Sequence, residues 1–327
     1  MGPELASLAA LPLLDGASGD ELEALAGLTR PGSAGVGEVL GHEGEPGDEF
    51  WLLLEGRVAV TLGGHHLADA GPGSILGELA LLRGRPRSAT VTAVEPCRYL
   101  SGGAEALERM LANGAVRARL RRLASARLAQ DLKPVHMSLG DGTAVVVRPL
   151  LPSDRPALDQ ALHNLSRDSI RRRFFTAGTP SPALVDYLID IDYVDHFAWV
   201  VMDVATHGGM ATGRYVRRPG DPAAEMAFTA VDRYQGRGLG TFLLGALGAT
   251  AVEAGIASLY AHVMEDNTPM RRVFAKAGGE TRFDEPGLVL VSVDPERAAG
   301  LLDPAIRSSL AEAVHDVVTA ASLALRV

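Results

Sequence analysis

The chain has 327 residues, a formal net charge of −9, 47% hydrophobic and 22% charged residues. This length exceeds one typical hydrophobic core and predicts two domains, while the acidic balance argues against a nucleic-acid-binding protein. No apolar run reaches the ~18 residues of a membrane helix, and Cys97, the single cysteine, excludes an internal disulfide and fits a cytoplasmic protein.

Residues 1–133 are predicted to form a β-rich domain. A short amphipathic helix is expected over 17–27, and short apolar runs then alternate with Gly/Pro turns. Closely spaced short strands of this kind predict a β jelly-roll barrel. From Ala104 to Leu132, apolar residues at helical spacing predict helices that flank the barrel. The clearest strands are Phe50–Leu54, Val58–Leu62 and Ala89–Val94.

Residues 143–293 alternate predicted strands and helices, which indicates an α/β domain with a mixed sheet. A linker is placed at 134–142, where Gly140-Asp141-Gly142 marks a turn. Residues 294–327 are expected to form a helical tail, a candidate regulatory segment. The expected strands are Thr143–Arg148, Phe197–Val204, Met210–Arg217, Glu225–Val231, Ser258–Val263 and Val289–Val293, and the expected helices are 153–165, 238–254 and 268–277.

The first of two ligand-binding motifs lies in the β-rich half, where Gly77-Glu78-Leu79-Ala80 is followed by Arg87-Ser88-Ala89-Thr90. A buried anion needs a cation and aligned N–H donors, and Arg87 and the start of a short turn at 78–82 supply them. Glu78 can accept a hydrogen bond from a ribose hydroxyl, and Gly77 permits a close backbone approach. The motif therefore indicates a pocket for a sugar and one phosphate.

With the upstream glycines, this motif resembles the phosphate-binding cassette of cyclic nucleotide-binding domains, over roughly residues 5–130. The resemblance implies that Glu78 contacts the ribose and that Arg87 and Ser88 contact the phosphate. Arg127 is a further candidate, placed near the base, although a solvated helix face is the alternative. Ser88 leaves cAMP and cGMP open, with cAMP favoured. A degenerate domain that binds nothing is the competing interpretation. The expected nucleotide-binding residues are Gly77, Glu78, Leu79, Ala80, Arg87, Ser88 and Arg127.

The second motif, Gln235-Gly236-Arg237-Gly238-Leu239-Gly240, lies between an expected strand and an expected helix. Glycines at this place let successive N–H groups point at one anion, with a helix N-terminus behind them. A dinucleotide-binding motif would follow the first strand of its domain, with an acidic residue about 20 residues later. Here the turn comes late in the domain, which points to another pyrophosphate ligand.

The order of these elements resembles the Gcn5-related N-acetyltransferase (GNAT) family over roughly residues 143–293, through Asp232–Thr241 and Asn267–Gly279. The resemblance implies acetyl-CoA as co-substrate. Backbone N–H groups of 236–241 would hold its pyrophosphate, Asn267 would bind the pantetheine arm, and Val231 would direct its backbone toward the thioester. The expected acetyl-CoA-binding residues are Val231, Gln235, Gly236, Arg237, Gly238, Leu239, Gly240, Thr241, Asn267 and Arg271.

The reaction of this family is the attack of an amine on a thioester. An ordinary lysine is mostly protonated at pH 7, and freeing its lone pair costs about 4.6 kcal/mol, so a nearby base is needed. Glu225 begins the strand that leads into the coenzyme loop and is the predicted general base; an ion pair with an arginine is the alternative. Many family members protonate the leaving thiolate with a tyrosine, but Phe274 stands at that position, and Tyr260 is the remaining candidate.

Leu165–Phe175 resembles a segment of bacterial protein lysine acetyltransferases that modify acyl-CoA synthetases, and periodicity alone would also allow an ordinary basic amphipathic helix. The fusion as a whole resembles the cyclic-nucleotide-regulated lysine acetyltransferases of mycobacteria. It implies a cAMP-regulated enzyme that acetylates a lysine of a target protein, with an acyl-CoA synthetase as the expected partner. A small-amine acetyltransferase, and a nucleotide-responsive module with an inactive transferase half, are the alternatives.

Regulation is expected to work through a cover over the acceptor channel, formed by the helices at 154–193 or by the tail at 294–327. His163 is the candidate residue that reaches Glu225 as a mimic of the incoming amine. A histidine packed between helices is the competing interpretation.

Overall fold

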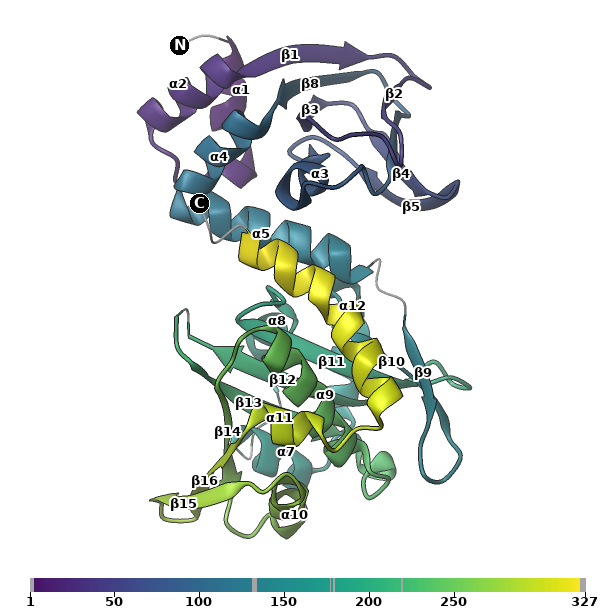
Figure 1. The fold of residues 1–327 in the computed structure, drawn as a ribbon, viewed down its shortest axis with the longest axis vertical. Coiled ribbons are helices and arrows are strands. Elements are labelled where there is room, and N and C mark those ends of the chain that lie inside the picture. Colours follow the sequence, from purple (N-terminus) through teal and green to yellow (C-terminus); the bar gives the residue numbers. More distant parts are fainter. Residues whose placement is uncertain (1–2, 131–133, 177, 179, 219, 324–327) are drawn as a thin grey trace. The chain divides into compact units, whose positions relative to one another are not determined.

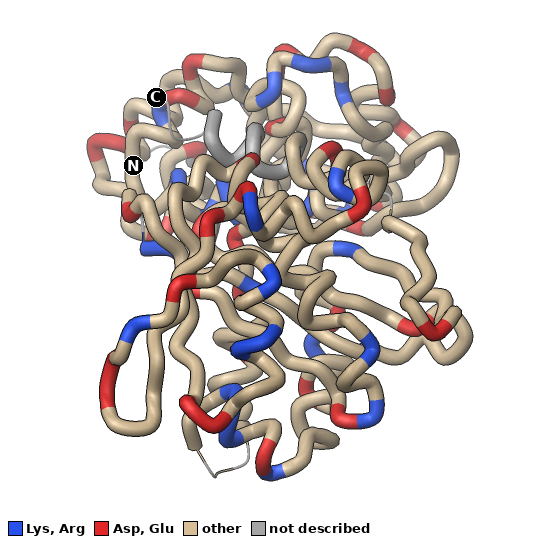
Figure 2. Tube along the Cα trace, turned by 60° about the horizontal axis from the view of Figure 1, so that its bottom comes forward, with Lys and Arg blue, Asp and Glu red and all other residues tan. Residues whose placement is uncertain are grey.

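The computed structural model describes residues 3–130, 134–176, 178, 180–218 and 220–323 (Figure 1). The chain divides into two compact units, the first comprising Met1–Ala124 and Ala320–Val327 and the second Ser125–Thr319. Within the described ranges, no helix is both long and apolar enough to cross a membrane. Figure 2 shows basic and acidic residues interspersed along the trace, unlike the continuous basic face of a nucleic-acid-binding protein.

The first unit contains two four-stranded antiparallel sheets whose inner faces share one apolar cluster that includes Trp51, Leu53, Val58 and Val91. This arrangement confirms the predicted jelly roll with flanking helices. One sheet has the order β1 (Thr29–Ala34), β8 (Cys97–Gly102), β3 (Phe50–Glu55), β6 (Ile75–Leu76), and the other β2 (Val39–Gly41), β7 (Thr90–Ala93), β4 (Val58–Leu62), β5 (His65–Ala70).

Two helices of the first unit begin at polar side-chain caps. Ser18 accepts a hydrogen bond from the N–H of Glu21, whose carboxylate accepts from the N–H of Ser18, a capping box that starts α2. The helical stretch expected over 104–132 is two helices, because Asn113 ends the first and its side chain accepts from the N–H groups of Ala115 and Val116 at the start of the second. The helices are α1 (Pro3–Ala9), a 3-10 turn (Pro12–Leu14), α2 (Gly19–Leu28), α3 (Glu78–Arg83), α4 (Ala104–Ala112) and α5 (Gly114–Gln130).

The second unit is built on one eight-stranded mixed sheet, as predicted. Every neighbouring pair is antiparallel except β13 and β14, which run parallel. The strand order is β15 (Glu280–Glu285), β16 (Leu288–Val293), β14 (Ser258–Met264), β13 (Ala223–Ala230), β12 (Gly209–Arg217), β11 (His196–Asp203), β10 (Ala144–Pro149), β9 (Val135–Ser138).

Residues 134–142, expected to be a linker, contain an edge strand of this sheet. β9 pairs with β10 in antiparallel register, and the turn between them includes Gly142 with φ of +83°. Four residues with alternating half-buried and exposed side chains are too short a pattern to stand out in a sequence.

Helices α9 and α11 of the second unit pack closely because α9 presents glycines to α11. A Cβ atom on Gly248 would lie 2.5 Å from the backbone nitrogen of Ala299, and one on Gly245 would lie 2.7 Å from the side chain of Leu302. The described residues after Val293 form two helices, as predicted, and the first of them, α11, packs against α9. The helices are α6 (Arg155–His163), α7 (Arg167–Phe174), α8 (Pro182–Ile189), α9 (Leu239–Glu253), α10 (Thr268–Lys276), α11 (Pro295–Ala299) and α12 (Pro304–Leu323), with 3-10 turns at Pro152–Asp154 and Asp232–Tyr234.

Candidate acyl-CoA cavity and nucleotide site

One cavity of the second unit opens where β13 and β14 separate. The two strands pair only over Ala223–Glu225 and Ser258–Tyr260, whereas β13 stays paired with β12 as far as Ala230. Beyond Glu225, no strand in the described part of the chain pairs with the edge of β13 that faces β14. A cavity of about 430 Å³ lies there, lined by both strands. The unpaired backbone edge of β13 in this cavity can bind the amides of an extended ligand.

The end of β13 leads into a loop that presents backbone N–H groups to this cavity. Gly236 and Gly238 adopt φ of +77° and +87°, a left-handed conformation that glycine adopts readily. Helix α9 begins at Leu239, and the N–H of Phe242 makes a hydrogen bond to the carbonyl of Gly238. The preceding N–H groups of the first turn have no carbonyl partner within the helix. This geometry is typical of an anion site.

Cationic side chains surround this loop. Lys276 Nζ lies 3.2 Å from Thr241 Oγ1 on the first turn of α9. Arg172 and Arg272 also line the cavity. A ligand with several phosphate charges would therefore find both backbone dipoles and full positive charges here.

Most residues expected to bind acetyl-CoA line this cavity, and three do not. The N–H of Val231 donates to Met210 O at 2.9 Å and its carbonyl accepts from Tyr234, so its backbone does not face a thioester. Arg237 pairs with Asp141 at 3.1 Å, and Arg271 donates to the carbonyl of Glu265. The residues that line the cavity are Gln235, Gly236, Gly238, Leu239, Gly240, Thr241 and Asn267.

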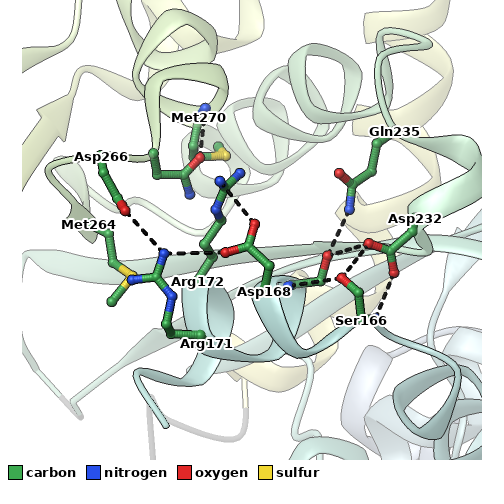
Figure 3. Close-up of polar contacts among 11 residues, drawn as sticks. Ser166, Asp168, Arg171, Arg172, Asp232, Gln235, Met264, Asp266 and Met270 are labelled. Atoms are coloured by element: carbon green, nitrogen blue, oxygen red, sulfur yellow. Dashed lines mark hydrogen bonds and ion pairs between the residues drawn. The ribbon is translucent and has the colours of Figure 1, made fainter. Parts of the chain in front are cut away.

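Helix α7 is hydrogen-bonded to the loop between β13 and α9, the coenzyme loop (residues 231–238). The bonds are made to the carboxylate of Asp232, which the sequence analysis did not single out (Figure 3). Asp232 accepts hydrogen bonds from the N–H and hydroxyl of Ser166 and from the hydroxyl of Ser169, at 2.7–2.9 Å. Gln235 donates to the Ser169 hydroxyl at 3.0 Å and to the carbonyl of Ala230. Burial raises the pKa of Asp232, but the hydrogen bonds from Ser166 and Ser169 outweigh it and hold the pKa below its usual range.

The same helix is tied to the loop that follows β14. Arg171 donates to Asp266 at 3.0 Å and to Asp168 at 3.2 Å, and Arg172 pairs with Asp168 at 2.9 Å (Figure 3). The segment Leu165–Phe175 thus contains helix α7, whose side chains contact the loops after the two diverging strands.

Glu225 lies at the point where the strands separate and lines the cavity, with 47% of its side chain exposed. Its Oε1 lies 3.2 Å from Nδ1 of His262, and Nε2 of His262 lies 3.5 Å from Asp284 Oδ2. An ion pair with an arginine was the alternative expected for Glu225, and its charge does interact with that of Arg173. Burial lowers the pKa of Arg173 to about 10, and the nearby charge of Glu225 partly opposes this effect.

The structure does not bring His163 to Glu225. The ring of His163 lies at the end of α6, with Nδ1 2.8 Å from the carbonyl of Asp159 on the same helix, and it does not line the cavity. Phe274 is buried and packs edge-on against Phe228 in the cavity wall. Tyr260 does not line the cavity, and burial raises its pKa.

The first unit holds the other predicted site at the start of α3. Glu78 is fully buried, and Arg87 is 8% exposed, donates to the carbonyl of Glu49 at 3.1 Å and lies over the ring of Trp51. Burial lowers the pKa of Arg87, and the nearby carboxylates, of which Glu49 acts most strongly, oppose this. A Cβ atom on Gly77 would lie 2.7 Å from the Arg87 guanidinium, which explains the glycine.

The other residues predicted for this site lie in different surroundings. The side chains of Leu79 and Ala80 are buried, so only their backbone can face a ligand. Ser88 is half-buried in the segment that enters β7. Arg127 lies on α5, outside the first unit.

No group of histidine, cysteine, aspartate or glutamate side chains that could hold a metal ion occurs among the residues described. The ligand chemistry that these residues offer is anion binding by N–H groups and arginines, and proton transfer at Glu225.

Comparison with known families matches both units. A cyclic nucleotide-binding domain model matches residues 33–113, and an acetyltransferase (GNAT) domain model matches residues 144–280. The acetyltransferase Pat of Mycolicibacterium smegmatis is 36% identical over 323 residues, which cover 97% of each chain. A Pseudomonas aeruginosa acetyltransferase is 34% identical over 145 residues, 43% of this chain and 77% of its own. A solved structure of a cAMP-binding acyltransferase from Mycobacterium smegmatis is 34% identical, with a TM-score of 0.51 and 98% coverage of both chains.

Proposed function

Because this chain belongs to the family of acetyltransferase Pat, in which a cyclic nucleotide-binding domain accompanies a GNAT domain, we propose that it transfers acetyl from acetyl-CoA to a lysine of a target protein under the control of cAMP. The chain is an acetyltransferase; the acceptor, the base and the regulation are the proposal. The observation that carries it is that Glu225 and the coenzyme loop open into one cavity.

Acetyl-CoA fits this cavity by its chemistry. Its pyrophosphate would lie against the N–H groups at the start of α9, with Lys276 and Arg272 nearby. Its pantetheine arm would add to the free edge of β13, and Asn267 would contribute its side-chain NH₂ group, because its Oδ1 already accepts from the N–H of Met270.

Glu225 would act at the end of this path as general base. It accepts the proton of the incoming lysine ammonium, and the freed amine attacks the thioester carbonyl. A backbone N–H of β13 would donate to the oxyanion. Phe274 cannot protonate the leaving thiolate, but a thiol with a pKa of about 8.5 leaves without a dedicated acid.

The nucleotide-binding half would supply the switch. The solved relative from Mycobacterium smegmatis is described as cAMP-binding, and buried Arg87 and Glu78 supply the charge and the acceptor that a phosphate and a ribose require. Binding of cAMP would change the transfer rate by about 5- to 150-fold, the range of typical allosteric coupling. The cytoplasmic location and the acyl-CoA synthetase as acceptor stay predictions that rest on the family resemblance.

The first experiment is acetyl transfer by the full chain to a purified acyl-CoA synthetase, with and without cAMP, read by mass spectrometry of lysines. We expect Glu225→Gln to lower kcat by about 10²- to 10⁴-fold with an unchanged Kd for acetyl-CoA, because only the proton acceptor is lost. Glu253→Gln is the matched control, since Glu253 also pairs with a histidine, His315, at 3.0 Å. Full activity of the Glu225 variant would refute the general base.

A further inference from the structure

A second titratable side chain, that of His262, lies next to Glu225. His262 lines the cavity, and its two ring nitrogens lie near two different carboxylates, Glu225 Oε1 at 3.2 Å and Asp284 Oδ2 at 3.5 Å. The three residues come from three strands, β13, β14 and β15. Tyr260 on β14 packs edge-on against the imidazole, with its ring centroid 6.0 Å away.

Two local features bring these groups together. Glu225 is the last residue of β13 paired with β14, opposite Tyr260, so that His262 is the next β14 residue on the same face. On β15 the register shifts between Phe283 and Glu285, which leaves Asp284 as the extra residue of a β-bulge. Bulges re-aim side chains next to active sites, and here the Asp284 carboxylate reaches His262 past the intervening β16.

This arrangement leads from the cavity to solvent. His262 exposes 34% of its side chain and Asp284 exposes 31%, and every residue of β15 is exposed. A neutral imidazole carries a proton on one nitrogen and a lone pair on the other. With the proton on Nε2, facing Asp284, the Nδ1 lone pair faces Glu225.

We propose that His262, a positioning residue, takes up the proton that Glu225 has accepted and carries it away through Asp284. The inference rests on the proposed function. Glu225 takes one proton from the lysine ammonium and passes it to Nδ1 of His262, and Nε2 releases one proton by way of Asp284 to solvent. The ring then has its starting charge with its proton on Nδ1, and proton exchange with solvent restores the Nε2–H tautomer before the next turnover.

The test is chemical rescue in the full chain. We expect His262→Ala to lower kcat by about 10- to 100-fold, to leave the KM for acetyl-CoA unchanged, and to regain at least several-fold activity with added imidazole. His262→Asn keeps a polar side chain beside Glu225 but cannot relay a proton, so it should stay slow. Asp284→Asn should lower kcat by a smaller factor. Combined with His262→Ala, it should reduce the activity that added imidazole restores.

The control is His315→Ala, which removes the other histidine–glutamate pair of this unit and should leave kcat unchanged and insensitive to imidazole. Wild-type activity of His262→Asn, or a slow His262→Ala that imidazole does not restore, would overturn the relay. If Glu225→Gln is slow while His262→Ala is fast, the relay alone is wrong. If Glu225→Gln is fast, the general base itself is wrong.

Discussion

Arg87 and Glu78 in the first unit are almost fully buried, whereas Glu225 in the second unit exposes 47% of its side chain. The nucleotide site consists of side chains held among packed neighbours, including an arginine that lies over Trp51. The candidate acyl-CoA cavity lies where two strands separate and leave an edge of β13 unpaired. Side-chain packing therefore sets the first site and strand topology sets the second, and substitutions should affect the two differently.

The largest effect in the first unit is expected for Arg87→Gln. Loss of a buried, charge-assisted contact to phosphate costs about 3 kcal/mol, or a factor of about 100 in the Kd for cAMP. Isothermal titration calorimetry measures this, and acetyl-CoA binding should stay unchanged. Arg98→Gln is the control, because Arg98 is a 63% exposed arginine of the same unit. Equal loss in both variants would contradict a specific phosphate contact.

Crowding around Gly77 gives the next effect. Gly77→Ala and Gly64→Ala both force alanine into a left-handed conformation, at about 1–2 kcal/mol, but a Cβ atom meets nothing within 4 Å at Gly64. We expect Gly77→Ala to lower the free energy of unfolding by about 1–3 kcal/mol more than Gly64→Ala does. Denaturant unfolding, followed by Trp51 fluorescence in a Trp199→Phe background, measures the difference. Equal costs would show that packing does not constrain this site.

In the second unit, Asp232→Asn tests whether the loop is held by α7. Weakening the hydrogen bonds from Ser166 and Ser169 should cost about 1 kcal/mol and raise the KM for acetyl-CoA about 5-fold, with a small change in kcat. Steady-state kinetics measures both constants. The control is Asp159→Asn on α6, outside the cavity. A fall in kcat with unchanged KM would contradict a role in holding the loop.

The smallest effect is the pH dependence of this contact. The pKa of Asp232 is lower in the folded chain than in the unfolded chain. Its contribution to stability is therefore fully present above the unfolded pKa and is lost as the pH falls through the folded pKa. Below about pH 4, the free energy of unfolding should fall less steeply with decreasing pH in Asp232→Asn than in the wild type. Identical acid profiles would mean that the carboxylate charge does not contribute.

Much of the fold followed from local patterns, and the exceptions have local reasons. The alternation of short apolar runs and glycine turns predicted the jelly roll, and strand–helix alternation predicted the mixed sheet. The break at Asn113 and the edge strand β9 were missed, because one capping residue and a four-residue strand carry little periodic signal.

In the candidate sites, residues close together in the sequence were predicted, whereas residues brought together by the sheet were not. Gly236 and Gly238 beside a helix start, and Glu78 followed by Arg87, were visible because each motif lies within a short stretch. His262 and Asp284 were not, because one strand register and one bulge bring them to Glu225. The expected contact of His163 with Glu225 is not formed, because the His163 ring makes a hydrogen bond within its own helix.

The amino-acid sequence by itself determined two domains, each with a candidate anion-binding loop, because glycine conformation, helix starts and hydrophobic period are properties of neighbouring residues. Only the tertiary structure decided where β13 and β14 separate, and therefore which distant side chains share the cavity. The physical reason is that a strand edge becomes free or paired according to its neighbour in the sheet, and the sequence of one strand does not contain that neighbour.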